Sequence, residues 1–280
     1  MRTTSEAPVA EPQPIKRTLD GGARDAASDP AAIRIRGLEH SFGDLEVIAS
    51  MDLCLRPGEV RGIVGPSGCG KSTLLELVSG LRGPSAGEIE VNGSSHPRRR
   101  LASCAYMPQR DLLLPWLSAI DNAAIALRNR GASRRKARRA AHPLFERFGL
   151  AGFEGTRPAE LSGGMRQRIA FLRTLLAGKP VLLLDEPFAS LDAITRAEMQ
   201  EWLAEALAGE SRSVILVSHD VEEALYLSDR VTVLSPRPAR AVGEVAAPAP
   251  RSRPRLEAVT DPAFTAARER ALGALTEATR

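Results

Sequence analysis

The stretch GPSGCGKS at residues 65–72 decides the fold, because it is a complete G-x-x-x-x-G-K-S phosphate loop. The apolar segment 60–64 before it predicts a buried parallel strand, and the segment 73–78 after it predicts a helix that Gly80 can end. The glycines let consecutive backbone N–H groups bend around a polyphosphate, and the N-terminus of the new helix adds its partial positive charge. A glycine-rich turn without a ligand is the alternative, and the strand and helix on either side argue against it.

The residues of this loop have separate expected roles. Lys71 would reach the β- and γ-phosphates of a nucleotide, and the hydroxyl of Ser72 would ligate magnesium. The nucleotide contacts predicted in this part of the chain are Gly65, Pro66, Ser67, Gly68, Cys69, Gly70, Lys71, Ser72 and Thr73.

Length and composition bound the class of protein. The chain has 280 residues, of which 43% are hydrophobic, so it can build a substantial core in one large domain or two small ones. It contains no run of about eighteen apolar residues and no apolar segment behind Arg2, so neither a membrane span nor a secretory signal is predicted. Cys54, Cys69 and Cys104 show no paired spacing and are expected to be reduced thiols. These features predict a cytoplasmic protein.

The net charge of +4 includes one basic cluster, at residues 133–139. Its five cations would be spread around about two helical turns instead of along one stripe. A solvated helix surface is the preferred interpretation, and contact with anionic headgroups is the alternative.

The order of segments predicts an α/β core with two additions. Residues 1–30 are rich in Pro, Gly, Ala, Ser and charge and are predicted to be disordered. Short segments at 33–36, 46–48 and 51–55 predict a small antiparallel sheet beside the nucleotide core. Residues of about 110–165 predict an inserted helical subdomain.

Two helices are expected in this insertion, and its approach is unusually apolar. Ser118 would cap a helix over 119–127, and a longer helix would cover 134–148. The run LLLPWL at 112–117 is either buried locally or a docking surface for another protein.

The main domain is predicted to span residues 31–235, followed by a C-terminal extension at 236–280. Repeated prolines are expected to interrupt regular structure until Asp261 and Pro262 begin a closing helix. The cations in this extension, Arg251, Arg253 and Arg255, are expected to be solvated.

A second helix start could also bind phosphate. In the run LSGGMRQR at 161–168, Ser162 is placed to cap a helix, and Gly163 and Gly164 leave N–H groups of its first turn uncovered. An ordinary helix cap is the alternative.

Carboxylates follow a buried strand in the run VLLLDEP at 181–187. In open α/β sheets, ligands bind at the carboxyl ends of the strands, where these carboxylates lie. Asp185 is therefore expected to hold magnesium, and Glu186, pointing the other way, to orient or deprotonate an attacking water. Capping of the next helix is the alternative.

Two further side chains are candidates for nucleotide contact. His219 follows the apolar strand 214–217 and could donate a hydrogen bond to a γ-phosphate, although a structural hydrogen bond is the alternative. Phe42, on a turn between two predicted strands, could stack on a purine ring or serve in packing.

Together these motifs resemble the ATP-binding cassette family over roughly residues 33–235. GPSGCGKST looks like its Walker A motif, LSGGMRQR like its signature motif and VLLLDEP like its Walker B motif. Met165 stands where the family usually has Gln. The resemblance implies an α/β fold of the P-loop NTPase (RecA-like) type with an antiparallel β subdomain and an inserted α-helical subdomain, and ATP and Mg²⁺ as cofactors.

The resemblance also implies roles for single residues. Gln109 corresponds to the Q-loop glutamine, with a catalytic and metal-binding part. Asp192, within Ser190-Leu191-Asp192, corresponds to the nucleotide-contacting D-loop. The implied catalytic set is Glu186, His219, Lys71 and Gln109, and the implied metal ligands are Ser72, Gln109 and Asp185.

The family resemblance implies an ATPase that works in a membrane complex. Its expected partners are a second copy bound head to tail, integral membrane permease subunits and an extracytoplasmic solute-binding protein, at the cytoplasmic face of the inner membrane. Residues 107–117 and 235–238 look similar to importers of nitrate, sulfonates and taurine.

Three other functions are alternatives to this one. The first is an importer for a pyrimidine or thiamine precursor. The second is a cassette ATPase acting on nucleic acid, against which the lack of heptad insertions and of a continuous basic and aromatic face argues. The third is a small-molecule kinase, which would not need a second phosphate-binding helix.

Overall fold

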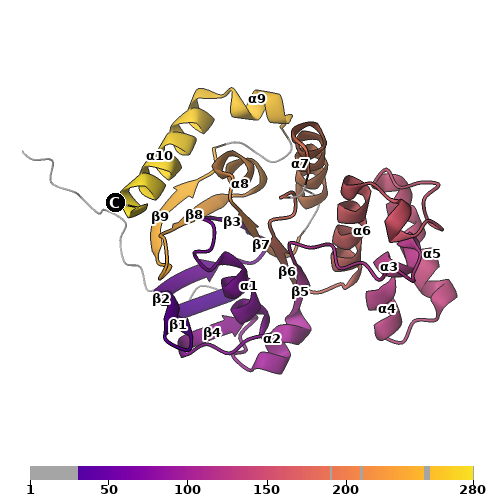
Figure 1. Cartoon of the computed structure of the whole chain (residues 1–280), viewed down its shortest axis with the longest axis horizontal. Helices are drawn as coiled ribbons and strands as arrows, with labels where there is room; N and C mark the ends of the chain where they lie inside the picture. The colour runs from indigo at the N-terminus through magenta and orange to yellow at the C-terminus, as the bar shows by residue number, and fades with distance from the viewer. Residues whose placement is uncertain (1–30, 190, 209–210, 249–252, 280) are drawn as a thin grey trace, which may run out of the picture.

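The computed structural model describes residues 31–189, 191–208, 211–248 and 253–279 (Figure 1). The predicted disorder of residues 1–30 and the position of Ser190 lie outside the described residues. The strands are β1 (Ile33–Phe42), β2 (Leu45–Leu55), β3 (Val60–Val64), β4 (Ala86–Val91), β5 (Cys104–Met107), β6 (Val181–Asp185), β7 (Ser213–Ser218), β8 (Arg230–Leu234) and β9 (Ala241–Ala246). The helices are α1 (Lys71–Ser79), α2 (Pro97–Ser103), α3 (Ala119–Ala123), α4 (Ile125–Asn129), α5 (Arg134–Arg147), α6 (Gly163–Leu176), α7 (Ala193–Ala208), α8 (Val221–Leu227), α9 (Arg255–Val259) and α10 (Pro262–Thr279), with a 3₁₀ turn η1 (Pro158–Glu160). Of the helices in these ranges, none has the length and apolar content to span a membrane.

A six-stranded sheet in the order β5-β6-β7-β3-β8-β9 forms the core. Its first five strands are parallel, and β9 runs antiparallel to β8 at the edge. Every residue of β3, β6 and β7 is buried, which explains the apolar runs 181–184 in β6 and 214–217 in β7. The predicted α/β fold class is confirmed.

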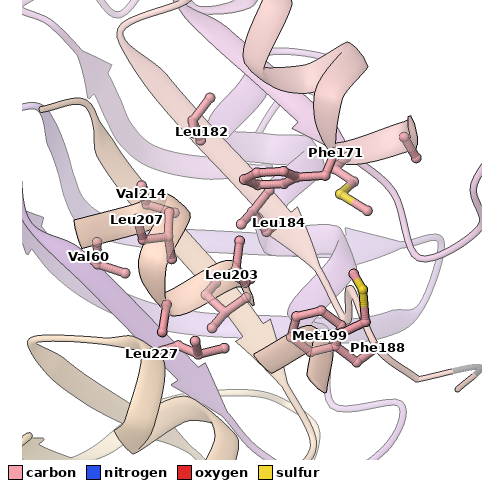
Figure 2. Close-up of a cluster of buried hydrophobic side chains, with 14 of the residues drawn as sticks. Val60, Phe171, Leu182, Leu184, Phe188, Met199, Leu203, Leu207, Val214 and Leu227 are labelled. Atoms are coloured by element: carbon pink, nitrogen blue, oxygen red, sulfur yellow. The ribbon is translucent and has the colours of Figure 1, made fainter. Parts of the chain in front are cut away.

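The two faces of this sheet pack against different layers. Leu182 and Leu184 of β6 lie with Phe171 of α6 and Leu203 of α7 in one apolar cluster (Figure 2). Leu183, between them in the chain, joins the cluster that contains α1 and the strands of the smaller sheet. Because side chains alternate along a strand, β6 supplies apolar side chains to the layers on both faces of the sheet.

The predicted small antiparallel sheet is present, in the order β2-β1-β4. The segments expected at 46–48 and 51–55 form one strand, β2, because Ser50 with a φ of 47° makes a bulge instead of a break. A turn follows β4 at Asn92 and Gly93, whose φ values of 48° and 73° suit an Asn-Gly pair. This sheet lies beside α1 in Figure 1.

The helical insertion projects from one side of the sheet (Figure 1). The single helix expected over 119–127 is divided, because Ala124 both ends α3 and begins α4. Ser118 caps α3 as predicted and accepts a hydrogen bond from the Asp121 N–H. Phe148 packs edge-on against Trp202 of α7, with 4.8 Å between ring centroids, and so joins the insertion to the core.

The basic cluster of α5 is a solvated surface that also carries ion pairs. Arg134 and Arg138 each place Nη2 2.6 Å from Oδ2 of Asp121, which is 1% exposed. The hydrogen bonds from Arg138 and then Arg134 hold the pKa of Asp121 well below its usual range. The side chains of Arg134 and Arg138 are 60% and 41% exposed, so they lie on a solvated surface as expected, and they also fix α5 on α3 through Asp121.

The C-terminal segment is integrated into the same fold. β9, which the sequence analysis missed among the prolines, pairs with β8, and α10 packs on β8, β9 and α8. The predicted closing helix is α10, and it continues to Thr279. Arg253 and Arg255 are partly exposed, at 38% and 27% of the side chain, and both are also paired: Arg253 with Asp261 at 2.7 Å and Arg255 with Glu222 at 2.6 Å. Arg251 lies outside the described residues.

We expect Phe264→Ala to lower the free energy of unfolding by about 3 kcal/mol or more, because it removes a fully buried ring of α10 and leaves a cavity. Urea unfolding of the full chain measures the change. The control is Leu256→Ala on α9, whose side chain is 73% exposed and whose loss should cost less than about 0.5 kcal/mol. Equal effects of both variants would show that α10 is not part of the cooperative unit.

Candidate functional site

The phosphate loop joins β3 to α1, and Lys71, the first residue of α1, lies at its centre. Its Nζ donates hydrogen bonds to the carbonyl oxygens of Gly65 at 2.9 Å and Pro66 at 3.0 Å. The side chain is 4% exposed and Nζ lies 3.7 Å from Oε1 of Glu186. The loop is therefore wrapped around a buried positive charge.

The backbone of the loop requires glycine at two positions. Gly68 and Gly70 have φ values of 75° and 120°, which L side chains rarely adopt. A Cβ on Gly70 would also lie 2.8 Å from Cγ1 of Val47. Gly70 precedes α1 without a side-chain cap, so N–H groups of the first turn are available to an anion, as the sequence predicts.

Asp185 ends β6 and is 2% exposed. Its Oδ1 accepts a hydrogen bond from the Ser72 hydroxyl at 3.1 Å, and its Oδ2 accepts one from the Tyr106 hydroxyl at 2.9 Å. Burial raises the pKa of Asp185, and these two hydrogen bonds oppose the increase. Tyr106 was missed because only the pairing of β5 with β6 brings it beside this carboxylate.

Glu186 meets side chains from three other parts of the chain. Its Oε2 lies 3.1 Å from Nε2 of Gln109, which follows β5, and 3.3 Å from Nδ1 of His219, which follows β7. Lys71 approaches its other oxygen. Glu186 also has a φ of 44°, an uncommon value for a non-glycine residue and one that occurs at functional sites.

Phe42 ends β1 and is 43% exposed. The His40 ring meets it edge-on at 4.8 Å, and the guanidinium carbon of Arg82 lies 4.6 Å from its centroid. Arg82 is in turn held by Glu76 at 2.9 Å. The ring is thus fixed by neighbours while still bordering open space, as a stacking platform requires.

A cavity of about 360 Å³ joins these groups. Its lining includes Phe42, Ser67, Gly68, Gly70, Lys71, Ser72, Thr73, Gln109 and Glu186, all of which the sequence predicts. The predicted contacts Gly65, Pro66 and Cys69 are not in its lining: the carbonyl oxygens of Gly65 and Pro66 accept hydrogen bonds from Lys71, and Cys69 is buried.

Arg237 also lines this cavity, although the sequence analysis assigned it no role. Its Nη2 and Nε donate to the carbonyl oxygen of Gly68 at 2.8 and 3.1 Å. The loop that carries Arg237 is fastened to β2, because the Ala239 N–H donates to the Val47 carbonyl at 2.8 Å. No local motif marks Arg237, because it reaches the phosphate loop only when β8 lies next to β3.

The signature residues lie elsewhere. Ser162 caps α6 by accepting a hydrogen bond from the Met165 N–H at 3.2 Å, and Gly163 lines a second cavity of about 580 Å³ with Gln109 and Gln167. Gly164 is buried, and a Cβ there would lie 3.0 Å from Thr195. The structure therefore does not bring these residues to the phosphate loop of the same chain.

Asp192 is exposed and caps α7. Its Oδ1 accepts hydrogen bonds from the N–H groups of Ile194 at 3.2 Å and Thr195 at 3.1 Å. Bonds from Thr195 lower the pKa of Asp192. Asp192 is not among the residues that line the cavity at the phosphate loop, so a single chain does not show its predicted contact with nucleotide.

These features define a P-loop nucleotide-binding protein with paired carboxylates at the phosphate loop.

Comparisons with known proteins agree with this class. The model of the ABC transporter family matches residues 48–189. Among curated relatives, the aliphatic sulfonates import ATP-binding protein SsuB 1 of Rhodococcus jostii is 44% identical over 75% of this chain and 81% of its own length. The formylaminopyrimidine import ATP-binding protein ThiZ of Halalkalibacterium halodurans is 43% identical over 72% of this chain and 78% of its own.

Solved structures show the same fold. The dimeric structure of MJ0796, a bacterial ABC transporter cassette, gives a TM-score of 0.68 at 25% identity, covering 78% of this chain and 99% of that one. CbiO1 of Clostridium perfringens gives a TM-score of 0.69 at 22% identity, covering 79% and 90%. The chain belongs to the ABC transporter family. It is an ATP-binding, ATP-hydrolysing subunit.

We expect Arg237→Ala to weaken ATP binding several-fold, roughly 1 kcal/mol, because the variant loses two charge-assisted bonds that hold the Gly68 carbonyl. Fluorescence titration with a labelled ATP analogue measures the dissociation constant. Arg240→Ala in the same loop is the matched control and should bind normally. Wild-type affinity of Arg237→Ala would refute the assigned contact.

Proposed function

We propose that this chain powers a membrane importer for small anions of the sulfonate, taurine or nitrate type. The observation that supports its hydrolytic role is Glu186, which Gln109, His219 and Lys71 surround at the phosphate loop. The cargo class rests on relatives named as aliphatic sulfonates import proteins, at 39 to 44% identity.

ATP would lie along the cavity from Phe42 to Glu186. Phe42 stacks on the adenine, and the loop N–H groups and Lys71 bind the phosphates. Bound ATP supplies the phosphoanhydride bond that is broken. Arg237 adds a second positive charge to the rim.

Ser72 and Asp185 suit a magnesium ion, because their oxygens lie 3.1 Å apart beside the loop. Mg²⁺ is six-coordinate and is usually bound by one or two carboxylates, with substrate phosphates and water among its other ligands. Asp185 would be the carboxylate, and the side-chain oxygens of Ser72 and Gln109, which lies next to Glu186, are the other proposed protein ligands. Bound there, the ion would neutralise phosphate charge.

Glu186 orients the attacking water and accepts its proton. The Gln109 amide and the His219 ring keep the carboxylate in place, both within 3.3 Å of Oε2. His219 and Lys71 then face the γ-phosphate, where a hydrogen bond and a positive charge stabilise the charge of the transition state.

Glu186→Gln should bind ATP normally and hydrolyse it at least about 100-fold more slowly, because an amide cannot accept the proton. Phosphate release and ATP binding are measured on the same preparation, and dimers should accumulate with ATP. Glu198→Gln, an exposed position on α7, is the control. Normal turnover in Glu186→Gln would reject the role.

The working unit is a head-to-tail homodimer. In this arrangement Ser162, Gly163 and Gly164 of one copy complete the phosphate site on the loop of the other. Support comes from the absence of these three residues from the cavity at the phosphate loop, since Gly163 lines a different one, and from the dimeric cassette structure of similar fold. Asp192, exposed on the D-loop, would face the second copy.

The permease would dock beside Trp116. This side chain is 68% exposed and borders a cavity of about 520 Å³. The lining combines apolar residues, Leu114, Leu117, Ile125 and Ala132, with polar ones, Arg128, Asn129, Ser133 and Arg134. Leu113, by contrast, is buried, so the apolar run is partly core and partly surface. A permease helix with an apolar face would fill this groove.

Trp116→Glu should reduce the amount of co-expressed permease recovered with the chain by about tenfold, because a charge would replace an aromatic anchor. Affinity capture from detergent extract measures recovery. Leu256→Glu, an equally exposed apolar site on α9, should leave it unchanged. Undiminished recovery with Trp116→Glu would place the permease elsewhere.

The chain would work as a peripheral subunit at the cytoplasmic face of the inner membrane. A solute-binding protein outside that membrane would deliver cargo, and nucleic acid has no part in the proposed cycle. Reconstitution with the permease and uptake of a panel of sulfonates, taurine, nitrate and formylaminopyrimidine tests the cargo. The ThiZ relative makes a pyrimidine or thiamine precursor the second candidate, and selective pyrimidine uptake would favour it.

A further inference from the structure

The helix α8 begins directly after His219. Asp220 caps it by accepting hydrogen bonds from the Glu222 N–H at 2.8 Å and the Glu223 N–H at 3.3 Å. α8 has seven residues, and a helix so short has little stability of its own. Its position, and with it the path of the chain at His219, therefore depends on what α8 contacts.

The C-terminal helices hold the first turn of α8 through Glu222. Arg255 of α9 places Nη2 2.6 Å from Oε1 of Glu222, and Arg268 of α10 places Nη1 3.3 Å from Oε2. In Figure 1, α9 and α10 pass around α8 on the side away from the smaller sheet. Both oxygens of one carboxylate are thus bound by cations from the last 26 residues of the chain.

A second connection runs through buried side chains. Nε of Arg255 donates to Oε1 of Gln200 on α7 at 2.8 Å, and Nε2 of Gln200 donates to Oε2 of Glu223 at 2.9 Å. Glu223 is 4% exposed. Burial raises its pKa, while hydrogen bonds from Ser218 and Gln200 oppose the increase. Ser218 is the residue immediately before His219.

We propose that Arg255 is a positioning residue for ATP hydrolysis, which through Glu222 and the Gln200–Glu223 pair fixes the chain on both sides of His219. The inference rests on the proposed role of His219. The His219 side chain is 45% exposed, so packing alone does not hold its ring near Glu186. A C-terminal segment outside the family match at 48–189 thereby sets the geometry of the hydrolytic site.

Arg255→Ala should lower the kcat of ATP hydrolysis by about tenfold, since small displacements of a catalytic group are costly. The KM for ATP should stay within about twofold, because nucleotide contacts lie on other elements. Arg255→Lys, which can keep the ion pair with Glu222, should fall between. The matched control is Arg253→Ala, whose guanidinium pairs with Asp261 and Glu257 and not with α8.

The full-length chain is used throughout, with thermal unfolding to check that each variant is folded. In the His219→Ala background, Arg255→Ala should cause no further loss of kcat. Glu222→Gln keeps the size of the side chain and should cause part of the same loss of kcat. It tests the proposal if Arg255→Ala does not fold. Unchanged kcat in both Arg255→Ala and Glu222→Gln, or equal losses in Arg253→Ala, would overturn the proposal. An inactive wild-type chain would instead count against the proposed ATPase function.

Discussion

The meeting of four chain segments at one edge of a parallel sheet is the constraint on which the site depends. Because β3, β7, β6 and β5 are neighbours and run in the same direction, their carboxyl ends deliver the phosphate loop, His219, the Asp185–Glu186 pair and Gln109 to one place. No single segment holds two of the contacts of Glu186. Burial of the apolar strands fixes their register, and the register aligns their carboxyl ends.

In the proposed dimer, this edge supplies one half of the phosphate site. The start of α6, proposed to supply the other half, lies on the helical insertion, where Gly163 lines a different cavity. A single chain therefore keeps the two proposed halves apart. The proposed dimer resolves this separation, and it also gives the exposed surface of the D-loop a function.

The sequence predicted those parts of the site that are encoded locally. The phosphate loop, the carboxylates after β6 and the cap of α6 each combine a motif with its own strand or helix, so spacing alone was informative. Tyr106, Arg237 and Arg255 were not predicted in their roles, because each acts on a residue distant in the chain: Asp185, Gly68 and Glu222.

The C-terminal region shows the same limit in the fold. β9 was missed because it is an edge strand of small residues flanked by prolines, and its identity comes from pairing with β8. α3 and α4 were read as one helix because apolar periodicity continues through Ala124. For β9, tertiary pairing and not local propensity decides the assignment.

Mixing two inactive variants tests the divided cradle most directly. Lys71→Ala removes the loop cation, and Ser162→Asp keeps a good helix cap while placing a negative charge where the phosphate should bind. In a mixed dimer one site combines both defects and the other is intact, so a 1:1 mixture should regain about a quarter of wild-type ATPase activity with random pairing. Activity no higher than that of either variant alone would contradict a nucleotide shared between two copies.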